Sequence, residues 1–146
     1  MPNKISTESQ IVAGQIHSVA IHLLRKLRRE DADSGLNAPR LSALSVIVFA
    51  GPVTLGDLAA AEQVRPPTMT RIVDALVELG LAAKNRNAAD GRSTLITPTP
   101  AGKMLLIEGR ERRVRTLARQ IDALSPGDRA TLQQAAEILK NVLPAM

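Results

Sequence analysis

Apolar residues recur at three- and four-residue steps along most of this chain, which is the spacing of helices with one buried face. The pattern predicts helices at about residues 8–30, 38–50, 54–62, 66–79, 100–123 and 126–143. Two short stretches, 81–86 and 93–97, instead favour strands, and a further short strand is expected at Val53. The predicted fold is mainly α (α+β), with about six helices and a small β-hairpin.

Residues 54–80 predict a helix-turn-helix, two short helices joined by a tight turn. Thr54 and Asp57 form a capping-box pair at the start of the first helix, and Gln63 begins the turn. The second helix starts at Pro66, where a missing N–H costs nothing, and stops at Gly80, which suits a left-handed cap. Its buried stripe is expected at Met69, Ile72, Val73, Leu76 and Val77.

The segment that follows predicts a wing. Strands 81–86 and 93–97 flank a polar loop, 87–92, whose Asn, Asp and Gly residues are typical of a hairpin tip. A β-hairpin placed directly after the second helix of a helix-turn-helix is a wing. Thr99-Pro100 then starts another helix, with a capping threonine and a first-position proline.

Several motifs between residues 64 and 102 carry a family resemblance. They are VRPPTMTRIVDAL at 64–76, Gly80-Leu81, Asp90-Gly91-Arg92 and LITPTPAG at 95–102. Together they resemble the MarR family of transcriptional regulators, whose recognition helix is similar to PPTxTRxVDxLxxxGL and whose wing carries Asp-x-Arg. The resemblance spans the whole chain in length and helix order. Arg65 is a departure, because it stands where a capping serine is common, and it adds a cation where the helix meets DNA.

The resemblance implies a single MarR-like domain over residues 1–146. Residues 36–99 would form the winged helix-turn-helix lobe that binds DNA, and residues 6–35 and 100–144 would form long terminal dimerisation helices. It also implies a homodimer that binds a pseudo-palindromic operator as a repressor and is relieved by a small ligand. The sequence pattern itself supports an interface at the terminal helices and leaves its stoichiometry open.

The terminal helices carry long apolar stripes. The first helix, with Thr7 and Gln10 as its capping box, has a stripe long enough to pack against another subunit as well as its own core. Its basic end, 25–29, favours a solvated helix terminus over phosphate contact. Ser125 with Asp128 caps the sixth helix. On the fifth helix the polar side is expected to hold Arg110, Arg112, Arg113, Arg115 and Arg119.

Net charge suggests a polyanionic partner without locating its contact surface. The chain has 146 residues, which suits one domain, and a formal net charge of +5. Residues 54–102 are nevertheless balanced, with five cations against five anions. They are Arg65, Arg71, Lys84, Arg86 and Arg92 against Asp57, Glu62, Asp74, Glu78 and Asp90. The placement of these side chains must therefore define the DNA-binding face.

Several function classes are disfavoured. The absence of cysteine excludes disulfides and thiolate metal sites. No signal-peptide pattern opens the chain, and its most apolar segment, 41–53, is too short to cross a bilayer, so a cytoplasmic protein without a membrane partner is expected. His17 and His22 lie on different sides of one helix, which disfavours a metal site. No catalytic set or cofactor motif is present, so we predict no enzyme and no cofactor.

The outward side of the helix that begins at Pro66 is predicted to contact DNA. With the apolar stripe turned inward, the outward and adjacent residues are Arg65, Pro67, Thr68, Thr70 and Arg71. Arg71 can donate a bidentate pair to guanine, and threonine suits a phosphate or a thymine methyl. The alternative role for Arg71 is a surface ion pair with Asp74 or Asp90.

The wing supplies a second group of candidates. Arg92, at the end of the hairpin, is placed to enter an adjacent minor groove, where narrow A·T-rich tracts concentrate negative potential. Asp90 is expected to orient Arg92 or stiffen the tip, as the Asp-x-Arg of the family suggests. Arg86 and Lys84 are phosphate candidates, with a solvated strand edge as the alternative.

An effector cleft is expected between the terminal helices and the winged lobe. Family habit implies a small amphipathic or aromatic ligand, and His17, Arg40 and Phe49 are the residues expected to line the cleft. A second function class stays open, because a fold does not dictate a function. It is a winged-helix module for protein–protein interaction or DNA architecture, without a small-molecule effector. The outward Thr/Arg face and Arg92 favour the regulator.

Overall fold

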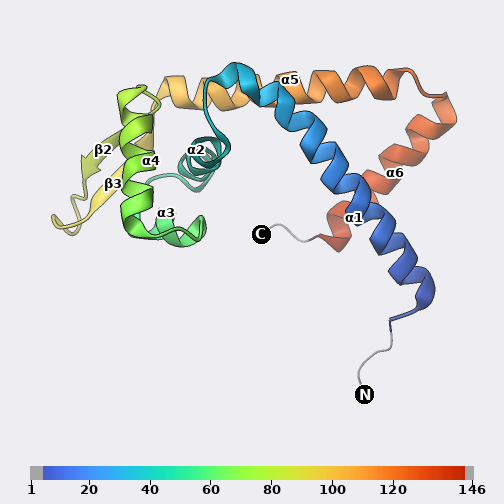
Figure 1. The fold of residues 1–146 in the computed structure, drawn as a ribbon, viewed down its shortest axis with the longest axis horizontal. Coiled ribbons are helices and arrows are strands. Elements are labelled where there is room, and N and C mark those ends of the chain that lie inside the picture. The colour runs from blue at the N-terminus through green and yellow to red at the C-terminus, as the bar shows by residue number, and fades with distance from the viewer. Residues whose placement is uncertain (1–4, 144–146) are drawn as a thin grey trace.

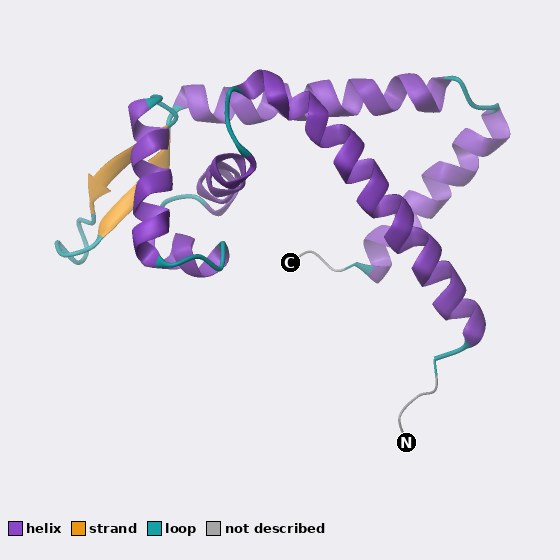
Figure 2. Ribbon diagram, viewed as in Figure 1, coloured by secondary structure: helices purple, strands orange, loops and turns teal. Residues whose placement is uncertain are grey.

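A computed structural model describes residues 5–143 of the chain, and over these residues the fold is mainly helical with one small sheet (Figures 1 and 2). The elements are α1 (Thr7–Leu27), the 3-10 segment η1 (Arg28–Ser34), α2 (Ala38–Ala50), β1 (Val53–Thr54), α3 (Leu55–Ala61), α4 (Pro66–Glu78), β2 (Ala82–Arg86), β3 (Thr94–Pro98), α5 (Pro100–Asp122) and α6 (Pro126–Val142). The expected fold class, a mainly α chain with a helix-turn-helix and a hairpin wing, is confirmed.

The core lies where α2, α3, α4 and the sheet meet. Helix α4 turns Met69, Val73 and Leu76 fully inward, and the other two residues of its expected stripe, Ile72 and Val77, are half-buried against the same core. The remaining core residues are Leu36, Ala43, Leu44, Ile47, Leu58, Ala59, Leu81, Ala82 and Ile96. The core is therefore aliphatic, as the composition requires.

The three strands form one antiparallel sheet in the order β1-β3-β2. Strand β3 is central, with Ile96 opposite Val53 on one side and opposite Lys84 on the other. The expected short strand at Val53 is confirmed. The β2–β3 hairpin extends beyond the helices as the wing (Figure 2).

Both helices of the helix-turn-helix end in a left-handed residue. Gly80 has φ 71°, and the amides of Gly80 and Leu81 return to the carbonyls of Val77 and Leu76 at 2.9 Å each, which is a Schellman cap. Gln63 does the same after α3 with φ 54°, although it has a Cβ atom. The turn between α3 and α4 is therefore short and defined by hydrogen bonds.

Two details at the first helix differ from the sequence-based expectation. The N-cap is Ser6, whose hydroxyl accepts from the Ser9 amide at 3.1 Å, and Thr7 is already helical. The α-helix also ends at Leu27 rather than near Glu30, and the chain continues as η1. Acidic residues at a helix C-terminus oppose the helix dipole, and the Ser34 hydroxyl donates to the Asp31 carbonyl at 2.6 Å, which favours the tighter turn.

Helix α5 is anchored to the winged lobe at its first turn. Thr99 caps it by accepting from the Gly102 amide at 3.1 Å, and the same hydroxyl donates to the Gly80 carbonyl at 2.6 Å. Gly102 is buried, and a Cβ atom there would lie 2.1 Å from the carbonyl oxygen of Leu81. The end of α4 and the start of α5 are thus in direct backbone contact.

The terminal helices extend away from this lobe. In Figure 1, α5 runs along the top from the lobe, and α1 and α6 slant downward on the right. Their stripes remain uncovered in the single chain, with Ile11 57% exposed, Val19 64% and Val142 65%. No helix among residues 5–143 is both long and apolar enough to span a membrane.

Candidate nucleic-acid interface

Helix α4 begins without a side-chain cap. Arg65 occupies the N-cap position and its side chain accepts no hydrogen bond there. The first two helical residues, Pro66 and Pro67, have no N–H to satisfy, and the Thr68 amide already donates to the Arg65 carbonyl at 3.0 Å. The helix therefore needs no serine at its start, and the arginine side chain is left exposed.

The outward face of α4 lies as the apolar periodicity requires. Arg65, Pro67, Thr68 and Arg71 are all exposed. Thr70 is half-buried, and its hydroxyl donates to the Pro66 carbonyl at 2.9 Å. Thr70 can therefore offer an oxygen lone pair or a methyl group to a partner, but its donor is already used.

The alternative role of Arg71, an ion pair with Asp74 or Asp90, is not observed. Asp74 is paired instead with the ammonium group of Lys84, on β2. No ion pair reaches Arg71 from any residue in the described range, 5–143. The same geometry weakens Lys84 as a phosphate contact, because its charge is already matched by a carboxylate.

The wing tip is held by two side chains. Asn87, which sequence analysis treated only as a turn residue, accepts from the Ala89 amide at 3.0 Å through its side-chain oxygen and donates to the Ser93 hydroxyl at 2.9 Å. The Asp90 carboxylate accepts from the backbone amide of Arg92 at 3.2 Å. No ion pair between the Asp90 carboxylate and the Arg92 guanidinium is found, so Asp90 contacts the backbone of the tip.

The acidic and basic side chains of residues 54–102 differ in how many of them have a bonding partner. Four of the five acidic side chains have a partner: Asp57 bonds Thr54, Glu62 bonds Ser42, Asp74 pairs with Lys84, and Asp90 bonds the Arg92 amide. The four arginines of this stretch are exposed, and no described residue pairs with any of them: Arg65, Arg71, Arg86 and Arg92. The lobe therefore presents four exposed guanidinium groups that have no ion-pair partner among the described residues.

These groups are gathered at one end of the lobe. In the view of Figure 1, the first turn of α4 and the tip of the β2–β3 hairpin both lie at the lower end, away from α5. A helix start and a hairpin tip that lie at the same end of the lobe, each with exposed arginines, can contact the backbone and base edges of a nucleic acid duplex. The basic end of α1 lies at the opposite, upper end, next to α5.

Two cavities lie between the lobe and the terminal helices. The first, of about 500 Å³, is lined by Leu24, Leu27, Arg28, Asp31, Ala32, Leu36, Ala38, Leu41, Ser42, Ser45, Leu106 and Arg113. The second, of about 650 Å³, is lined by Ser45, Val48, Phe49, Lys103, Leu106, Ile107, Arg110 and Arg113. Both combine an aliphatic wall with arginine side chains.

Only Phe49 of the three expected ligand residues lines either cavity. Phe49 is 78% exposed at the mouth of the second. Arg40 lies off the α2 face formed by Ala38, Leu41 and Ser45, and His17 is almost two turns of α1 before the first lining residue. Helix phase therefore turns Arg40 away from the first cavity, and distance along α1 separates His17 from it.

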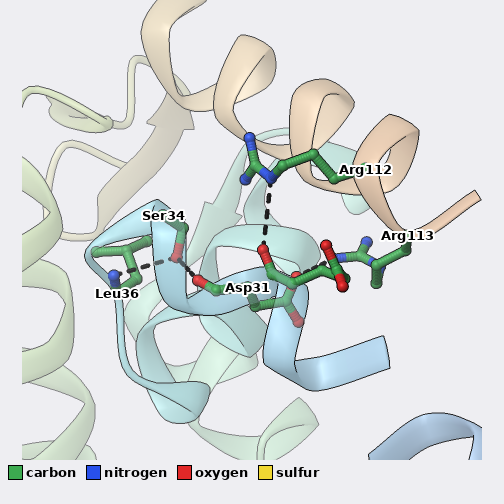
Figure 3. Close-up of polar contacts among 6 residues, drawn as sticks. Asp31, Ser34, Leu36, Arg112 and Arg113 are labelled. Atoms are coloured by element: carbon green, nitrogen blue, oxygen red, sulfur yellow. Dashed lines mark hydrogen bonds and ion pairs between the residues drawn. The ribbon is translucent and has the colours of Figure 1, made fainter. Parts of the chain in front are cut away.

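Polar contacts between α5 and η1 were not expected from the sequence. Arg113 forms an ion pair with Asp31, and the Arg112 Nε donates to the Glu30 carbonyl at 3.4 Å (Figure 3). Sequence periodicity placed both arginines on a solvent-facing side of α5, but they are half-buried. Among residues 5–143, no group of three or more His, Asp or Glu side chains is arranged to hold a metal ion.

Comparison with known proteins identifies the group to which this architecture belongs. A MarR family model matches residues 34–93. An uncharacterised HTH-type transcriptional regulator of Mycobacterium bovis is 31% identical over 128 residues, covering 88% of this chain and 90% of the relative. A relative of the same description from Mycobacterium leprae is 30% identical over 132 residues, covering 90% of this chain and 92% of its own.

Solved structures agree in fold. A transcriptional regulator of Thermotoga maritima superposes with a TM-score of 0.83 at 22% identity, over 91% of this chain and 94% of the other. A MepR mutant of Staphylococcus aureus, solved bound to an oligodeoxyribonucleotide, has a TM-score of 0.71 at 16% identity, over 90% of this chain and 98% of the other. The chain belongs to the MarR family and is a DNA-binding helix-turn-helix transcriptional regulator, not an enzyme.

Proposed function

We propose that the protein is a homodimeric repressor that binds a pseudo-palindromic operator and releases it when a small ligand binds. The single observation that carries the DNA-binding part is the set of exposed, unpaired arginines on α4 and the wing, in a lobe whose acidic side chains are mostly engaged. The oligonucleotide bound to MepR, a protein of the same fold, supports the same mode of use.

Helix α4 would enter the major groove. Arg71, exposed and without an ion-pair partner among the described residues, would form the bidentate contact with guanine. Thr68 and Pro67 would lie against phosphate or a thymine methyl, and Thr70 would contribute its methyl group, because its hydroxyl donor is used within the helix. Arg65 would contact a phosphate at the start of the helix.

The wing would follow the adjacent minor groove. Arg92, at the tip, would enter a narrow A·T-rich groove, and Asp90 would hold the backbone at Arg92 so that the side chain points outward. Arg86, at the end of β2, would contact a phosphate. In this assignment α4 contacts base edges in the major groove, and the wing recognises the width of the minor groove.

A second copy of the chain would cover the terminal helices. In the single chain, α6 buries none of its side chains, and only Leu139 is half-buried within it. α1 likewise has no buried residue. Apolar stripes of this length are typical of an obligate interface. Two recognition helices related by a two-fold axis would then meet half-sites about 34–36 Å apart. We place the protein in the cytoplasm, where operator DNA is accessible.

The ligand would occupy the space between the lobe and the terminal helices. The second cavity is lined by aliphatic side chains, Phe49 and three cations, which suits an amphipathic or aromatic molecule. To release DNA, the ligand must bind the non-DNA-binding geometry more tightly than the DNA-binding one.

The test is a fluorescence anisotropy titration with duplex DNA from upstream of the protein's own gene, over a range of salt concentrations. Specific binding by a dimer, with log K falling steeply against log salt, is the expected result. A monomer at micromolar concentration that ignores this DNA would instead favour a winged-helix module for protein–protein interaction.

A further inference from the structure

The positive charge of this chain lies outside its helix-turn-helix and wing. Residues 54–102 carry five cations and five anions, so the whole formal net charge of +5 belongs to residues 1–53 and 103–146. A surplus of cations is typical of a protein with a polyanionic partner. Because the helix-turn-helix and the wing contribute none of this surplus, a second basic surface is expected on the helices around them.

A group of cations lies together at the end of α1. A hollow of about 340 Å³ is lined there by His22, Arg25, Lys26 and Arg29. All four side chains are exposed, and none of them forms an ion pair with a residue in the range 5–143. We call these four residues the α1 basic face.

The carboxylates that follow α1 leave this face uncovered. Glu30, Asp31 and Asp33 belong to η1, but none of them lines the hollow. Asp31 is instead paired with Arg113 of α5 (Figure 3). The cations of the α1 basic face are therefore available to an external partner.

The helix dipole explains only part of this arrangement. Arg25 and Lys26 lie in the last turn of α1, where cations stabilise a helix C-terminus. That effect does not depend on which side of the helix the cations occupy. His22, one turn earlier, and Arg29, in η1, nevertheless line the same hollow as Arg25 and Lys26. A continuous cationic face of this kind suits an extended anion.

The α1 basic face is turned away from the surface proposed for the second copy of the chain. At roughly 100° per residue, Ile16, Leu23 and Leu27 of the apolar stripe lie about 130° around α1 from the centre of the basic face. Dimerisation through the stripe would therefore leave the basic face free. Leu23 and Leu27 are also half-buried within the chain, so this end of α1 does not present an apolar side to a bilayer, as a membrane-surface helix does.

The length and the position of the α1 basic face suit a duplex other than the one that α4 contacts. From His22 to Arg29 the chain advances by about 10 Å, and one DNA strand carries a phosphate about every 3.4 Å along the duplex axis, so the face spans about three phosphates. The end of α1 lies at the upper end of the view in Figure 1, whereas the first turn of α4 and the wing tip lie at the lower end. A duplex bound by α4 and the wing would therefore lie away from this face.

We propose that the α1 basic face binds the phosphate backbone of a second DNA duplex, without sequence preference, while α4 and the wing bind the first. The protein thereby bridges two DNA segments. The contact is made by the charged groups of Arg25, Lys26 and Arg29, with His22 as a further hydrogen-bond donor. It requires neither a small ligand nor a repressor role.

The experiment is a bridging assay with the full chain. A duplex from upstream of the protein's own gene is immobilised, saturated with protein and washed, and capture of a short labelled duplex of unrelated sequence is measured over a range of salt concentrations. The wild type should capture the second duplex. Arg25→Gln/Arg29→Gln should reduce capture by about tenfold or more and lower the slope of log K against log salt by about 2, because each lost phosphate contact contributes about 0.9. Binding of this variant to the immobilised duplex should be unchanged.

Two further variants separate the face from net charge and from folding. Arg119→Gln/Arg129→Gln is the matched control, because it removes two exposed arginines on either side of the turn between α5 and α6, and the ion pair that Arg129 forms with Asp122 is exposed. Arg25→Lys/Arg29→Lys retains both charges of the face. Both variants should capture the second duplex as the wild type does, and all variants should keep the wild-type melting temperature.

Several outcomes would overturn the proposal. They are a wild type that captures no second duplex, an equal loss of capture in the Arg119→Gln/Arg129→Gln control, and full capture by Arg25→Gln/Arg29→Gln. Full capture by that variant would assign bridging to the two α4 helices of a dimer. If Arg25→Gln/Arg29→Gln instead lost binding to phosphatidylglycerol vesicles and kept capture of the duplex, a lipid surface would replace DNA as the partner of this face.

Discussion

In the winged lobe, α4 turns Met69, Val73 and Leu76 into a core where none of them retains exposure, whereas on α6 an equally regular stripe leaves Leu132 46% and Val142 65% exposed. Both helices are amphipathic. Helix α4 ends in the Schellman cap at Gly80, and α6 begins at Ser125, which accepts from the Asp128 amide at 3.1 Å. The difference lies in what surrounds them. The lobe closes its core within one chain, whereas the apolar stripes of the terminal helices are not covered within that chain.

This difference separates two kinds of stability. The lobe holds its recognition helix by contacts with residues 36–102 of the same chain, so the shape of the DNA-binding face is a property of the monomer. The terminal helices depend on what covers them, so in the proposed dimer the spacing between the two recognition helices is a property of the assembly. Helix α5 belongs to both, because its first turn is fastened to the lobe and the rest extends beyond it.

The largest effect is expected from a charge on the uncovered stripe. Leu132→Glu should be harmless in a monomer, where this side chain is 46% exposed, but should place an unpaired carboxylate inside the proposed dimer interface. An uncompensated buried charge destabilises by about 3–5 kcal/mol. Sedimentation velocity should therefore show monomers, and operator affinity should fall by more than tenfold.

Gln133→Glu is the matched control for this change, since it adds the same charge to α6 at an exposed polar position. The control should remain dimeric. If Leu132→Glu also remains dimeric and binds DNA normally, the α6 stripe is not the interface.

The next effect concerns the joint between the two regions. Gly102→Ala would place a methyl group 2.1 Å from the Leu81 carbonyl oxygen, so the start of α5 must shift away from the end of α4. We expect a loss of about 3 kcal/mol in the free energy of unfolding, measured by urea denaturation.

Gly109→Ala, in the same helix, tests whether the loss is specific to the joint. Its nearest neighbours are the flexible ends of Arg113 and Arg112, at 3.4 and 3.7 Å. A better helix former in the middle of α5 should leave stability unchanged or raise it by up to about 1 kcal/mol. Equal losses for both alanines would mean that the close approach at Gly102 is not what joins the lobe to α5.

Within the lobe, Arg71→Ala should act on DNA and leave folding intact. The side chain is exposed and has no ion-pair partner in the described chain, so the melting temperature should not change. Operator affinity should fall by about 1–3 kcal/mol, and selection from a random DNA pool should show relaxed preference at one position per half-site. A complete wild-type sequence preference in this variant would place base readout elsewhere on α4, at Arg65, Thr68 or Thr70.

Arg92→Ala should have the smallest effect and the most selective one. Because the wing tip would read groove width rather than a base edge, affinity should fall by roughly 1 kcal/mol at A·T-flanked sites and by less at G·C-flanked sites. Anisotropy titrations on two operators that differ only in their flanks measure this. A loss of thermal stability instead would assign Arg92 to the structure of the wing.

Local sequence signals were reliable where the interaction is itself local. The caps at Thr54, Thr99 and Ser125 were each expected, because an N-cap and the amide three residues later are the only partners. At the first helix two hydroxyl residues stand side by side, and local preference could not choose Ser6 over Thr7. The strands were expected to within one residue for the same reason, since turn residues and β-branched runs bound them.

The sequence by itself determined the helix-turn-helix, the wing, the inward stripe of α4 and the outward position of Arg71, because each follows from periodicity within one element. Only the tertiary structure decided which charges are matched. It assigned Asp74 to Lys84 rather than to Arg71, and it joined Arg113 to Asp31 across 82 residues of sequence. It also placed His17 and Arg40 outside the lining of the two cavities. The physical reason is the same in each case. An ion pair or a cavity wall forms where two elements meet, and the spacing of apolar residues within one element does not determine how that element is rotated relative to the other.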